Sequence, residues 1–306
     1  MSGREIAQAD AVVICGTYVF PDVFPVLENP FRPDATVIHI DLDAYDIAKN
    51  HPVTLGLVSD PKPTLRLLAE AVADRQTPAQ QQAARDRAER SAREKQQQRA
   101  DEKEADRANR TTVRLHMAAF AEELHKQLPT DAIVYDESLT YSQELMRWLP
   151  PTTPGQFFQT PGGTLGVGIP GAVGVKLAHP DRTVVGFTGD GGAMFTYQAL
   201  WTAAHHRIGA KFVVCHNASY RILKHNIVRY WRDRGQQPDQ AFPPSFDIRE
   251  PELDFVSLAH GLGVPGCRVS QPTEIAGAIT TMLEHDGPYL IELVLESHVP
   301  RTPAKE

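Results

Sequence analysis

Short runs rich in Val and Ile alternate with helix-forming segments along most of this chain, and this alternation limits the fold more than any other feature. In residues 111–300 the apolar runs are AIVY (132–135), TVVGF (183–187), KFVVC (211–215) and LIELV (290–294). The helical segments are 112–127, about 139–148, 166–178, about 196–207, 252–260 and 272–285, and a short segment lies near 266–270. Apolar strands separated by helices pair in parallel, because each connection crosses a face of the sheet. We therefore predict an α/β fold with a doubly wound, mostly parallel sheet that has helices on both faces.

Two further parts precede this region. Residues 1–75 carry the apolar runs AVVIC (11–15) and TVIHIDLD (36–43) and a helical pattern over about 61–74, which predict a partial α/β domain. In residues 76–110 alanine is the only apolar residue type, and acids interleave with bases. This composition favours a polar, charged helical linker, solvated or mobile, because no large side chain can anchor it. Residues 301–306 form a tail.

Composition disfavours several classes of function. The 306-residue chain has a formal net charge of −7, which argues against nucleic acid or an anionic membrane as the principal partner. No apolar stretch reaches the ~20 residues of a membrane span, and the N-terminus MSGREIAQAD lacks the apolar core of a signal peptide. Cys15, Cys215 and Cys267 are far apart, so we expect buried thiols rather than disulfides. These features together predict a cytoplasmic protein.

A glycine-rich sequence with one acid follows the run TVVGF. Thr188-Gly189-Asp190-Gly191-Gly192 lies where that predicted strand ends and a helix begins. Glycines let a backbone approach a ligand closely, and amides at the start of a helix can bind phosphate oxygens. An aspartate there would repel phosphate unless it held a divalent cation that bridges to the phosphate. The pattern therefore predicts a metal and a phosphate group together.

Further oxygen ligands follow the next apolar run. KFVVC leads into His216-Asn217-Ala218-Ser219-Tyr220, so Asn217 comes one helix and one strand after Asp190. Ligands of such sheets bind at the carboxyl ends of the strands, where we expect these two loops to meet. A carboxylate, an amide oxygen and a backbone carbonyl suit Mg²⁺, with phosphates completing its coordination. Gly-Asp-Gly alone is a weak signal, but its pairing with Asn after a second strand is strong.

The pattern of Gly-Asp-Gly followed at a distance by Asn resembles the thiamine diphosphate (ThDP) binding motif. Residues 160–224 resemble the C-terminal pyrophosphate domain of the decarboxylase and acetolactate synthase superfamily, and come closest to benzoylformate decarboxylase in the segments ALWTAA and NASY. Residues 10–75 resemble the second half of that superfamily's central domain. The resemblance implies ThDP and Mg²⁺ as cofactors and a small 2-oxo acid as substrate, with ThDP as the electron sink for its decarboxylation.

The resemblance, carried over position by position, implies a metal site and a diphosphate site. Asp190 and Asn217 would give side-chain oxygens to Mg²⁺, and Ser219 would give its backbone carbonyl. The residues around the diphosphate would be Gly189, Gly191, Gly192, Ala193 and Tyr220, while Phe195 stands where the family has a phosphate-contacting tyrosine. The loop closing over the other side would be 136–140, with Glu137, Ser138 and Thr140.

The same resemblance implies the positions of the remaining cofactor and of the substrate. In the segment Gly162–Gly166, Leu165 matches the bulky residue that supports the bent cofactor. The Gly163 carbonyl matches the acceptor for the aminopyrimidine, and Thr164 lies between the two. The substrate pocket would be lined by Ile222, Leu223 and Asn226. No residue of this chain is predicted to be catalytic.

This chain departs from the family pattern in two respects. Full-length relatives have an N-terminal pyrimidine-binding domain whose glutamate contacts the cofactor, and no counterpart is found here. Benzoylformate decarboxylase has a His after a Val-Phe pair and an aromatic ring at the pocket, whereas this chain has Val19–Phe24 without His, and Asn226. These differences disfavour benzoylformate as the substrate.

Three hypotheses follow. The chain is one subunit of a split ThDP enzyme whose partner chain brings the glutamate, a truncated non-catalytic relic, or a module that binds another diphosphate. Because the family binds ThDP between two subunits, a homo-oligomer is also expected.

Other patterns are weaker. Gly166–Gly171 matches the dinucleotide fingerprint G-x-G-x-x-G but follows a glycine-rich loop instead of a strand. His205 and His206 are adjacent on a predicted helix and point in different directions, so no shared metal is expected. DLDAYD (41–46) lacks the glycine and distal glutamate of an EF-hand. Asp190 could cap a helix, but a cap explains neither the flanking glycines nor Asn217.

Overall fold

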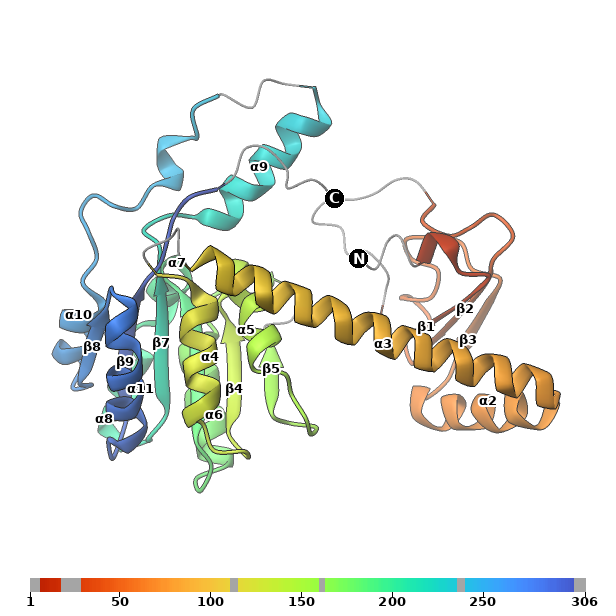
Figure 1. Ribbon diagram of the computed structural model, residues 1–306, viewed down its shortest axis with the longest axis horizontal. Coiled ribbons are helices and arrows are strands. Elements are labelled where there is room, and N and C mark those ends of the chain that lie inside the picture. The colour runs from red at the N-terminus through yellow and green to blue at the C-terminus, as the bar shows by residue number, and fades with distance from the viewer. Residues whose placement is uncertain (1–5, 18–28, 111–114, 160–162, 236–239, 300–306) are drawn as a thin grey trace. The chain divides into compact units, whose positions relative to one another are not determined.

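The computed structural model describes residues 6–17, 29–110, 115–159, 163–235 and 240–299 (Figure 1). By its internal contacts the chain divides into two compact units, Met1–Glu94 and Lys95–Glu306. Three features named from the sequence lie outside the described residues: the stretch Val19–Phe24, Gly162 and the tail 301–306.

The first unit is a small parallel sheet followed by a helix. Its strands β1 (Ala11–Cys15), β2 (Thr36–Asp41) and β3 (Leu55–Val58) pair in that order, and α2 (Pro61–Arg75) comes next. β1, β2 and α2 confirm the predicted elements. β3 is missing from the prediction because four residues interrupted by a glycine form too short an apolar run to stand out.

The core of this unit is small. Ile14, Phe31 and Val37 form its buried cluster. Helix α2 contributes no buried residue, and Leu65 and Leu67 are 41% and 58% exposed. Leu65 and Leu67 do not form one apolar side of the helix, because residues two apart on a helix do not share a face.

Helix α3 (Pro78–Asn109) occupies most of the segment predicted as a polar helical linker, and the division between the two units falls within it. It is 32 residues long, and Asp106 is its one buried residue. Side chains four residues apart interact along it, as Gln82 with Asp86 and Gln97 with Asp101, each at 2.7 Å. Such pairs stabilise a helix by about 0.2–0.5 kcal/mol each. Within the described residues, no helix combines the length and the apolar character needed to cross a membrane.

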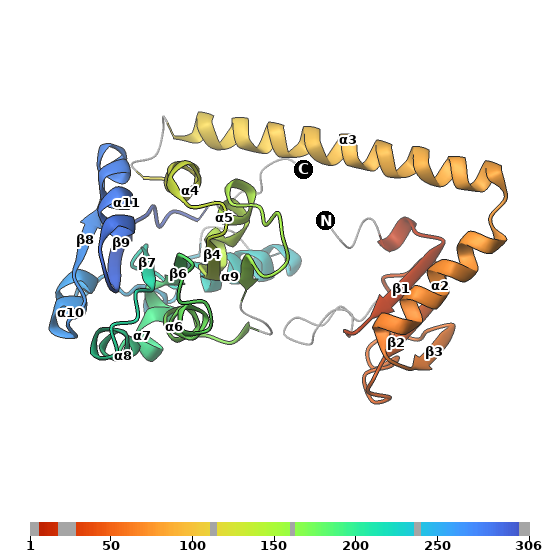
Figure 2. The ribbon, with the colours of Figure 1, turned by 90° about the horizontal axis from the view of Figure 1, so that it is seen from below.

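The second unit is built on a parallel sheet, as predicted, and six of its strands are described (Figures 1 and 2). Its strands, in the spatial order β5-β4-β6-β7-β9-β8, are β4 (Ile133–Glu137), β5 (Phe157–Gln159), β6 (Val184–Gly189), β7 (Lys211–His216), β8 (Gly266–Val269) and β9 (Tyr289–Val294). Its helices are α4 (Met117–Gln127), α5 (Ser142–Trp148), α6 (Gly168–Ala178), α7 (Asp190–Thr196), α8 (Ala199–His205), α9 (Arg221–Asp233), α10 (Phe255–Gly261) and α11 (Ile275–Glu284). Three 3₁₀ turns accompany them: η1 (Leu139–Tyr141), η3 (Pro244–Phe246) and η4 (Pro272–Glu274).

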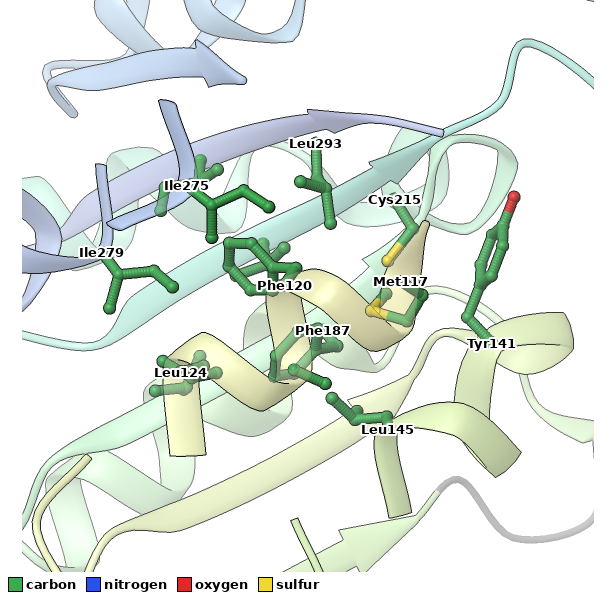
Figure 3. Close-up of a cluster of buried hydrophobic side chains, with 14 of the residues drawn as sticks. Met117, Phe120, Leu124, Tyr141, Leu145, Phe187, Cys215, Ile275, Ile279 and Leu293 are labelled. Atoms are coloured by element: carbon green, nitrogen blue, oxygen red, sulfur yellow. The ribbon is translucent and has the colours of Figure 1, made fainter. Parts of the chain in front are cut away.

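Helices cover both faces of this sheet. α4, α5 and α11 pack on one face, and α6, α7, α8 and α10 on the other (Figure 2). Along β7, Val213 and Cys215 join the first layer and Phe212 and Val214 the second, as the two-residue period of a strand requires. Figure 3 shows the first layer, where Phe120 of α4 packs among side chains of the sheet and of α11. Because β6 and β7 are buried on both faces, the loops that follow them start from rigid positions.

Three elements differ from the prediction for local reasons. The predicted helix 196–207 is divided between the end of α7 and α8. α4 begins at Met117, later than residue 112, because the His116 imidazole caps it by accepting the Ala118 amide at 3.2 Å. α9 lies in a region predicted to be irregular. Its apolar residues Leu223, Ile227 and Trp231 recur every four positions, but Arg, Lys and His are so frequent between them that composition favours a polar, irregular segment.

One buried acid fixes the end of α3 to the second unit. Arg147 of α5 donates from Nη1 to both oxygens of Asp106 at 2.7 Å, and from Nε to Glu102 at 3.0 Å. The Trp148 indole donates to the same Asp106 carboxylate at 2.8 Å, and Lys103 lies 4.6 Å above the indole ring. A carboxylate that leaves water requires this many donors. The anchor of α3 is therefore polar and aromatic instead of aliphatic.

Replacing Asp106 should test this anchor. In Asp106→Ala, Trp148 loses its acceptor and Arg147 keeps Glu102 alone, so we expect the unit to lose about 2–3 kcal/mol of stability. Urea unfolding followed by tryptophan fluorescence measures the change. The matched control Asp101→Ala, on the exposed part of α3, should lose less than about 0.5 kcal/mol. Equal losses in the two variants would contradict the proposed anchor.

Glu144 of α5 is a second acid in this interior. Its carboxylate lies 3.5 Å from His116 Nδ1, and its Oε2 has no hydrogen-bond partner among the described residues. Burial, reinforced by the negative charge of Asp106, raises the pKa of Glu144 from 4.5 to about 7. The folded protein therefore binds a proton here over a pH range in which the unfolded chain releases it.

This difference in proton binding predicts a pH-dependent stability. The stabilisation is fully present below the unfolded pKa near 4.5 and is lost as the pH rises through about 7. Glu144→Gln should therefore match the natural chain at pH 4.5 and exceed its stability at pH 8 by about 1–3 kcal/mol. Urea unfolding at a series of pH values measures both curves, and parallel curves would show that Glu144 keeps an ordinary pKa.

Candidate functional site

The carboxyl ends of β4, β6 and β7 meet at one edge of the sheet, and the loops after them enclose a cavity of about 270 Å³. Leu165, before α6, and the first residues of α9 complete its wall. The lining residues are Ser138, Leu139, Thr140, Leu165, Gly189, Asp190, Gly191, Gly192, Phe195, Asn217, Ser219, Tyr220, Arg221, Ile222 and Leu223. Folds of this class bind ligands at this edge, so the cavity is the candidate site.

A larger cavity lies elsewhere and has a different character. It measures about 370 Å³ beside the amino ends of β4 and β5, among Pro129, Pro150, Pro151 and Gln156. None of the residues predicted to bind a ligand lines it. It also lies away from the edge where parallel sheets bind ligands, so we do not assign it a function.

Asp190 joins the ends of two neighbouring strands. Its side chain is buried, with Oδ1 accepting the Gly191 amide at 2.7 Å and Oδ2 accepting the amides of Asn217 at 2.9 Å and Ala218 at 2.6 Å. Burial raises the pKa of Asp190, and the amide hydrogen bonds oppose that rise. Two of the three donors lie after β7, so the carboxylate does more than cap α7.

Asn217 presents an oxygen that none of the described residues satisfies. The residue is 8% exposed, and its Oδ1 has no hydrogen-bond partner among the described residues. Ala218 next to it has a φ of +54°, a left-handed conformation that costs a residue with a Cβ about 1 kcal/mol or more. The Ser219 hydroxyl donates to the Phe246 carbonyl at 3.2 Å and holds this turn in place. Strain and an unpaired acceptor at one turn are typical of a ligand site.

The oxygens at this edge fit a hard divalent cation. The predicted ligands Asp190, Asn217 and Ser219 all line the cavity. The Ser219 carbonyl already accepts the Arg221 amide at 2.7 Å, which leaves its second lone pair. No group of three or more His, Cys, Asp or Glu suited to a metal occurs in the described part of the chain. A cation here would therefore depend on one carboxylate, one amide and one carbonyl, and on oxygens of its own ligand.

Close packing explains the glycines that follow Asp190. A Cβ at Gly191 would lie 2.6 Å from the Tyr220 ring, and one at Gly192 would lie 2.8 Å from Glu137 Oε1. Gly189, Gly191, Gly192 and Tyr220 line the cavity as predicted. Ala193 does not: its side chain is buried in the core layer beneath α7, so only its backbone could take part in binding.

Glu137 does not have the position predicted for it. Its buried carboxylate accepts the amides of Gly166 and of Gly168, the latter at 2.5 Å, and lies 3.3 Å from the Thr188 hydroxyl. An ionised carboxylate only accepts hydrogen bonds, and these amides offer the nearest donors. Glu137 therefore holds the segment before α6 against β6, and its side chain is not part of the cavity wall.

The loop after β4 reaches the cavity through its later residues. Ser138 and Thr140 line the wall, but the Ser138 hydroxyl donates to Asp136 at 2.6 Å. Leu139 between them has a φ of +52° and also lines the wall, although the sequence did not single it out. Both loops thus contain a left-handed residue: Leu139 in the wall itself, and Ala218 between the wall residues Asn217 and Ser219.

The segment before α6 is only partly in the wall. Leu165 lines it and is 43% exposed, as suits a residue that supports a ligand. Gly163 and Thr164 lie beside it without lining the cavity. Phe195 also lines the wall and is 63% exposed. Phe195 packs directly against Gly166: a Cβ added to Gly166 would lie 2.6 Å from the Cβ of Phe195. The backbone of this segment therefore sets the position of the Phe195 ring.

Of the residues predicted to contact the substrate, some line the cavity and one does not. Ile222 and Leu223 line the cavity, each 40% exposed, whereas Asn226 lies one turn further along α9 and does not. Sequence reasoning missed Arg221, which directly precedes them and lines the same wall. A cation next to a predicted phosphate loop was the signal that could have identified it.

Two of the weaker sequence patterns have local packing explanations. His205 stacks on Trp201, with ring centroids 4.7 Å apart, and its ring also lies edge-on to that of His206, again with centroids 4.7 Å apart. Gly171, the last glycine of the dinucleotide-like pattern, packs against Tyr135, where a Cβ would lie 2.4 Å from the ring. That glycine is explained by helix–sheet packing.

Curated proteins share sequence with this chain. The benzoylformate decarboxylase of Pseudomonas aeruginosa is 36% identical over 56% of this chain and 31% of its own length. The acetolactate synthase isozyme 2 large subunit of Escherichia coli is 26% identical over 95% of this chain and 48% of its own length. The chain thus spans between about a third and about a half of the length of these relatives.

Solved structures and family models agree with these relatives. The ThDP-dependent 4-hydroxybenzoylformate decarboxylase of Rhodococcus jostii superposes with a TM-score of 0.73 at 25% identity, over 96% of this chain and 50% of that one. Residues 3–68 match the thiamine pyrophosphate enzyme central domain. Residues 140–293, which contain the whole cavity wall except Ser138 and Leu139, match the C-terminal TPP binding domain. The chain therefore belongs to the thiamine pyrophosphate enzyme family.

Proposed function

We propose that this chain binds ThDP through Mg²⁺ and forms the diphosphate half of the active site of a 2-oxo acid decarboxylase or carboligase. Membership of the thiamine pyrophosphate enzyme family supports the cofactor. The relatives named benzoylformate decarboxylase and acetolactate synthase support the reaction class.

The unpaired oxygen of Asn217 carries the proposal for the metal. Leaving a buried polar atom unsatisfied costs about 1–3 kcal/mol, and Asn217 Oδ1 has no hydrogen-bond partner within the described residues. A divalent cation would satisfy it. The same ion would be held by Asp190 Oδ1, which accepts one amide and keeps a second lone pair, whereas Oδ2 already accepts two amides.

The rest of the wall supports a diphosphate next to that ion. Gly191 and Gly192 lie in the first turn of α7, where the Gly191 amide already donates to Asp190, and Thr140 and Tyr220 bring hydroxyl groups from the two flanking loops. Leu165 would support the organic part of the cofactor. When bound, ThDP supplies an electron sink for cleavage or formation of a carbon–carbon bond next to a carbonyl. The chain's own residues bind and orient the cofactor and keep water from one side of it.

Ile222 and Leu223 would contact the substrate. Both are aliphatic and line the cavity at the start of α9, which favours a 2-oxo acid with an apolar substituent. Asn226 lies off the wall, so its amide would influence the substrate only from a distance.

A second protein surface would complete the site. Leu165, Phe195, Ile222 and Leu223 are large apolar side chains at the cavity, each at least 40% exposed, and such clusters favour contact with protein. We assign this contact to a pyrimidine-binding domain that brings the glutamate, on a partner chain or in a homo-oligomer. The chain described here would then bind the cofactor and depend on that surface for turnover.

Two variants should remove metal-dependent binding. Asp190→Asn keeps the shape of the side chain but loses its charge, and Asn217→Ala removes an oxygen that makes no hydrogen bond in the structure. We expect each to weaken ThDP binding about a hundredfold or more in the presence of Mg²⁺, because even residues that only orient metal ligands contribute ten- to a hundredfold. Calorimetric titration with ThDP, with and without Mg²⁺, measures this.

His205→Ala is the control and should bind like the natural chain, since His205 lies outside the cavity wall. Titration with Mg²⁺–ADP separates a ThDP site from a general diphosphate module, which would bind both ligands alike. Undiminished binding by Asn217→Ala would contradict the metal assignment, and this variant should fold normally because no hydrogen bond is lost.

A further inference from the structure

Glu144 of α5 has no part in the proposed binding of the cofactor, and one of its oxygens lacks a partner. Its Oε2 is buried without a hydrogen bond among the described residues. The Nδ1 of His116 lies 3.5 Å away but already accepts the Ala118 amide at 3.2 Å, so it offers no proton. An ionised Oε2 would therefore face a second acceptor. A protonated carboxyl avoids this conflict, so the arrangement suits the neutral form of Glu144.

A donor without an acceptor lies close to this oxygen. Arg221, the first residue of α9, has a buried Nε with no hydrogen-bond partner in the described part of the chain. Its Cζ lies 4.9 Å from the centre of the Tyr141 ring. Tyr141 precedes Glu144 by three residues in the continuous helical segment of η1 and α5, so the two side chains are neighbours. The guanidinium on Tyr141 therefore lies near Glu144 without forming an ion pair with it.

The other cations around Glu144 already have acceptors. After burial and the charge of Asp106, the largest influences on the pKa of Glu144 are those of Arg221 and then Arg147. Arg147 donates to Asp106 and to a second acid of α3. Arg110, which directly follows α3, donates to an acid and to a carbonyl of α4. An ionised Glu144 would therefore find its unused donor in Arg221.

Glu144 is the group of this interior that titrates near neutral pH. Burial lowers the pKa of His116 and of His225 from the usual 6.5. Burial also raises the pKa of Cys215 above 9.0 and that of Tyr141 above 10.0. For Glu144, burial and the negative charge of Asp106 raise the pKa from 4.5 to about 7. Among these groups, Glu144 is thus the one that changes its charge as the pH rises through 7.

We propose that Glu144 is a positioning residue for the cavity wall: when it ionises, its carboxylate accepts the Nε–H of Arg221 and shifts the first turn of α9. The proton passes to water, and the guanidinium leaves the Tyr141 ring. The two residues after Arg221, Ile222 and Leu223, line the cavity and would move with that turn. The proposal rests on the ThDP function proposed above only for the ligand that the wall receives.

Magnetic resonance of the unliganded chain tests both steps without a ligand. The Nε–Hε signal of Arg221 and the methyl signals of Ile222 and Leu223 should shift together with pH, with a midpoint of about 7. Glu144→Gln keeps the shape of the side chain but cannot ionise, so these shifts should be lost. The matched control Glu104→Gln changes an exposed acid of α3 and should titrate like the natural chain.

Arg221→Met provides the reciprocal test. Because Arg221 opposes the rise in the pKa of Glu144, the carboxyl signal of Glu144 should titrate at a higher pH in this variant. The methyl signals of Ile222 and Leu223 should no longer shift near pH 7, since the side chain that links them to Glu144 is gone. Arg229→Met, which removes an exposed arginine from the same helix, should change neither.

Calorimetric titration with Mg²⁺–ThDP connects the shift to binding. The Arg221 amide donates to the carbonyl of Ser219, a proposed metal ligand, so a shift of this turn disturbs the metal site. The natural chain and Glu144→Gln should bind alike at pH about 6. At pH about 8, one unit above the midpoint, the natural chain should bind up to about tenfold more weakly. Comparing both proteins at the same pH cancels the titration of the ligand itself.

Three results would overturn the inference. The signals of Arg221, Ile222 and Leu223 could fail to titrate near pH 7, or could titrate equally in Glu144→Gln, where another group would be responsible. The Arg221 signal could shift while both methyl signals stay constant, which would limit Glu144 to a local contact. Equal affinities of the two proteins at pH about 8 would exclude an effect on the site. If no ThDP binds at either pH, the proposed function fails, and the resonance titrations still decide whether Glu144 positions α9.

Discussion

The hydrogen bonds of one buried carboxylate decide how this site is built. Asp190 leaves water at the end of β6 and recovers its hydrogen bonds from amides that follow β7, so the tips of two strands are joined at a single side chain. This link places Asn217 in the cavity wall and fixes Ala218 in a left-handed conformation. The layers of helices on both faces keep the strands too rigid to relax the strain. The proposed metal ligation and phosphate binding depend on this junction, as does the direction of α9.

The sequence alone predicted the parallel sheet of the second unit and the pair formed by Asp190 and Asn217. Apolar runs separated by helical segments determine that topology, and parallel strands bring their carboxyl ends to one edge whatever the surface residues are. The cavity confirms that the loops after β6 and β7 come together. The positions of Ser138, Thr140, Leu165, Ile222 and Leu223 in its wall were also predictable, because a resemblance to a family fixes the order of its loops.

The parts that sequence reasoning missed depend on where individual polar groups find partners. Glu137 was assigned to the ligand but accepts amides from the segment before α6, a choice made by tertiary distance and not by residue type. α9 has a regular apolar stripe of Leu223, Ile227 and Trp231, but its many Arg, Lys and His residues give it the composition of a polar loop, and composition does not place Arg221 in the wall. The anchor of α3 was invisible for a different reason: a lone aspartate in a charged helix looks like every other acid there until Arg147 and Trp148 surround it.

The contact between Gly191 and Tyr220 also constrains how the family can diverge at this site. A Cβ at position 191 would lie 2.6 Å from the ring of Tyr220, although the two residues belong to different loops. Each position thus sets the size allowed at the other. A lineage could enlarge residue 191 only after residue 220 had become smaller. In the reverse order, the intermediate protein would contain the clash between the two side chains. The two positions should therefore change together, and in a fixed order, wherever descendants of this sequence alter the glycine-rich segment after β6.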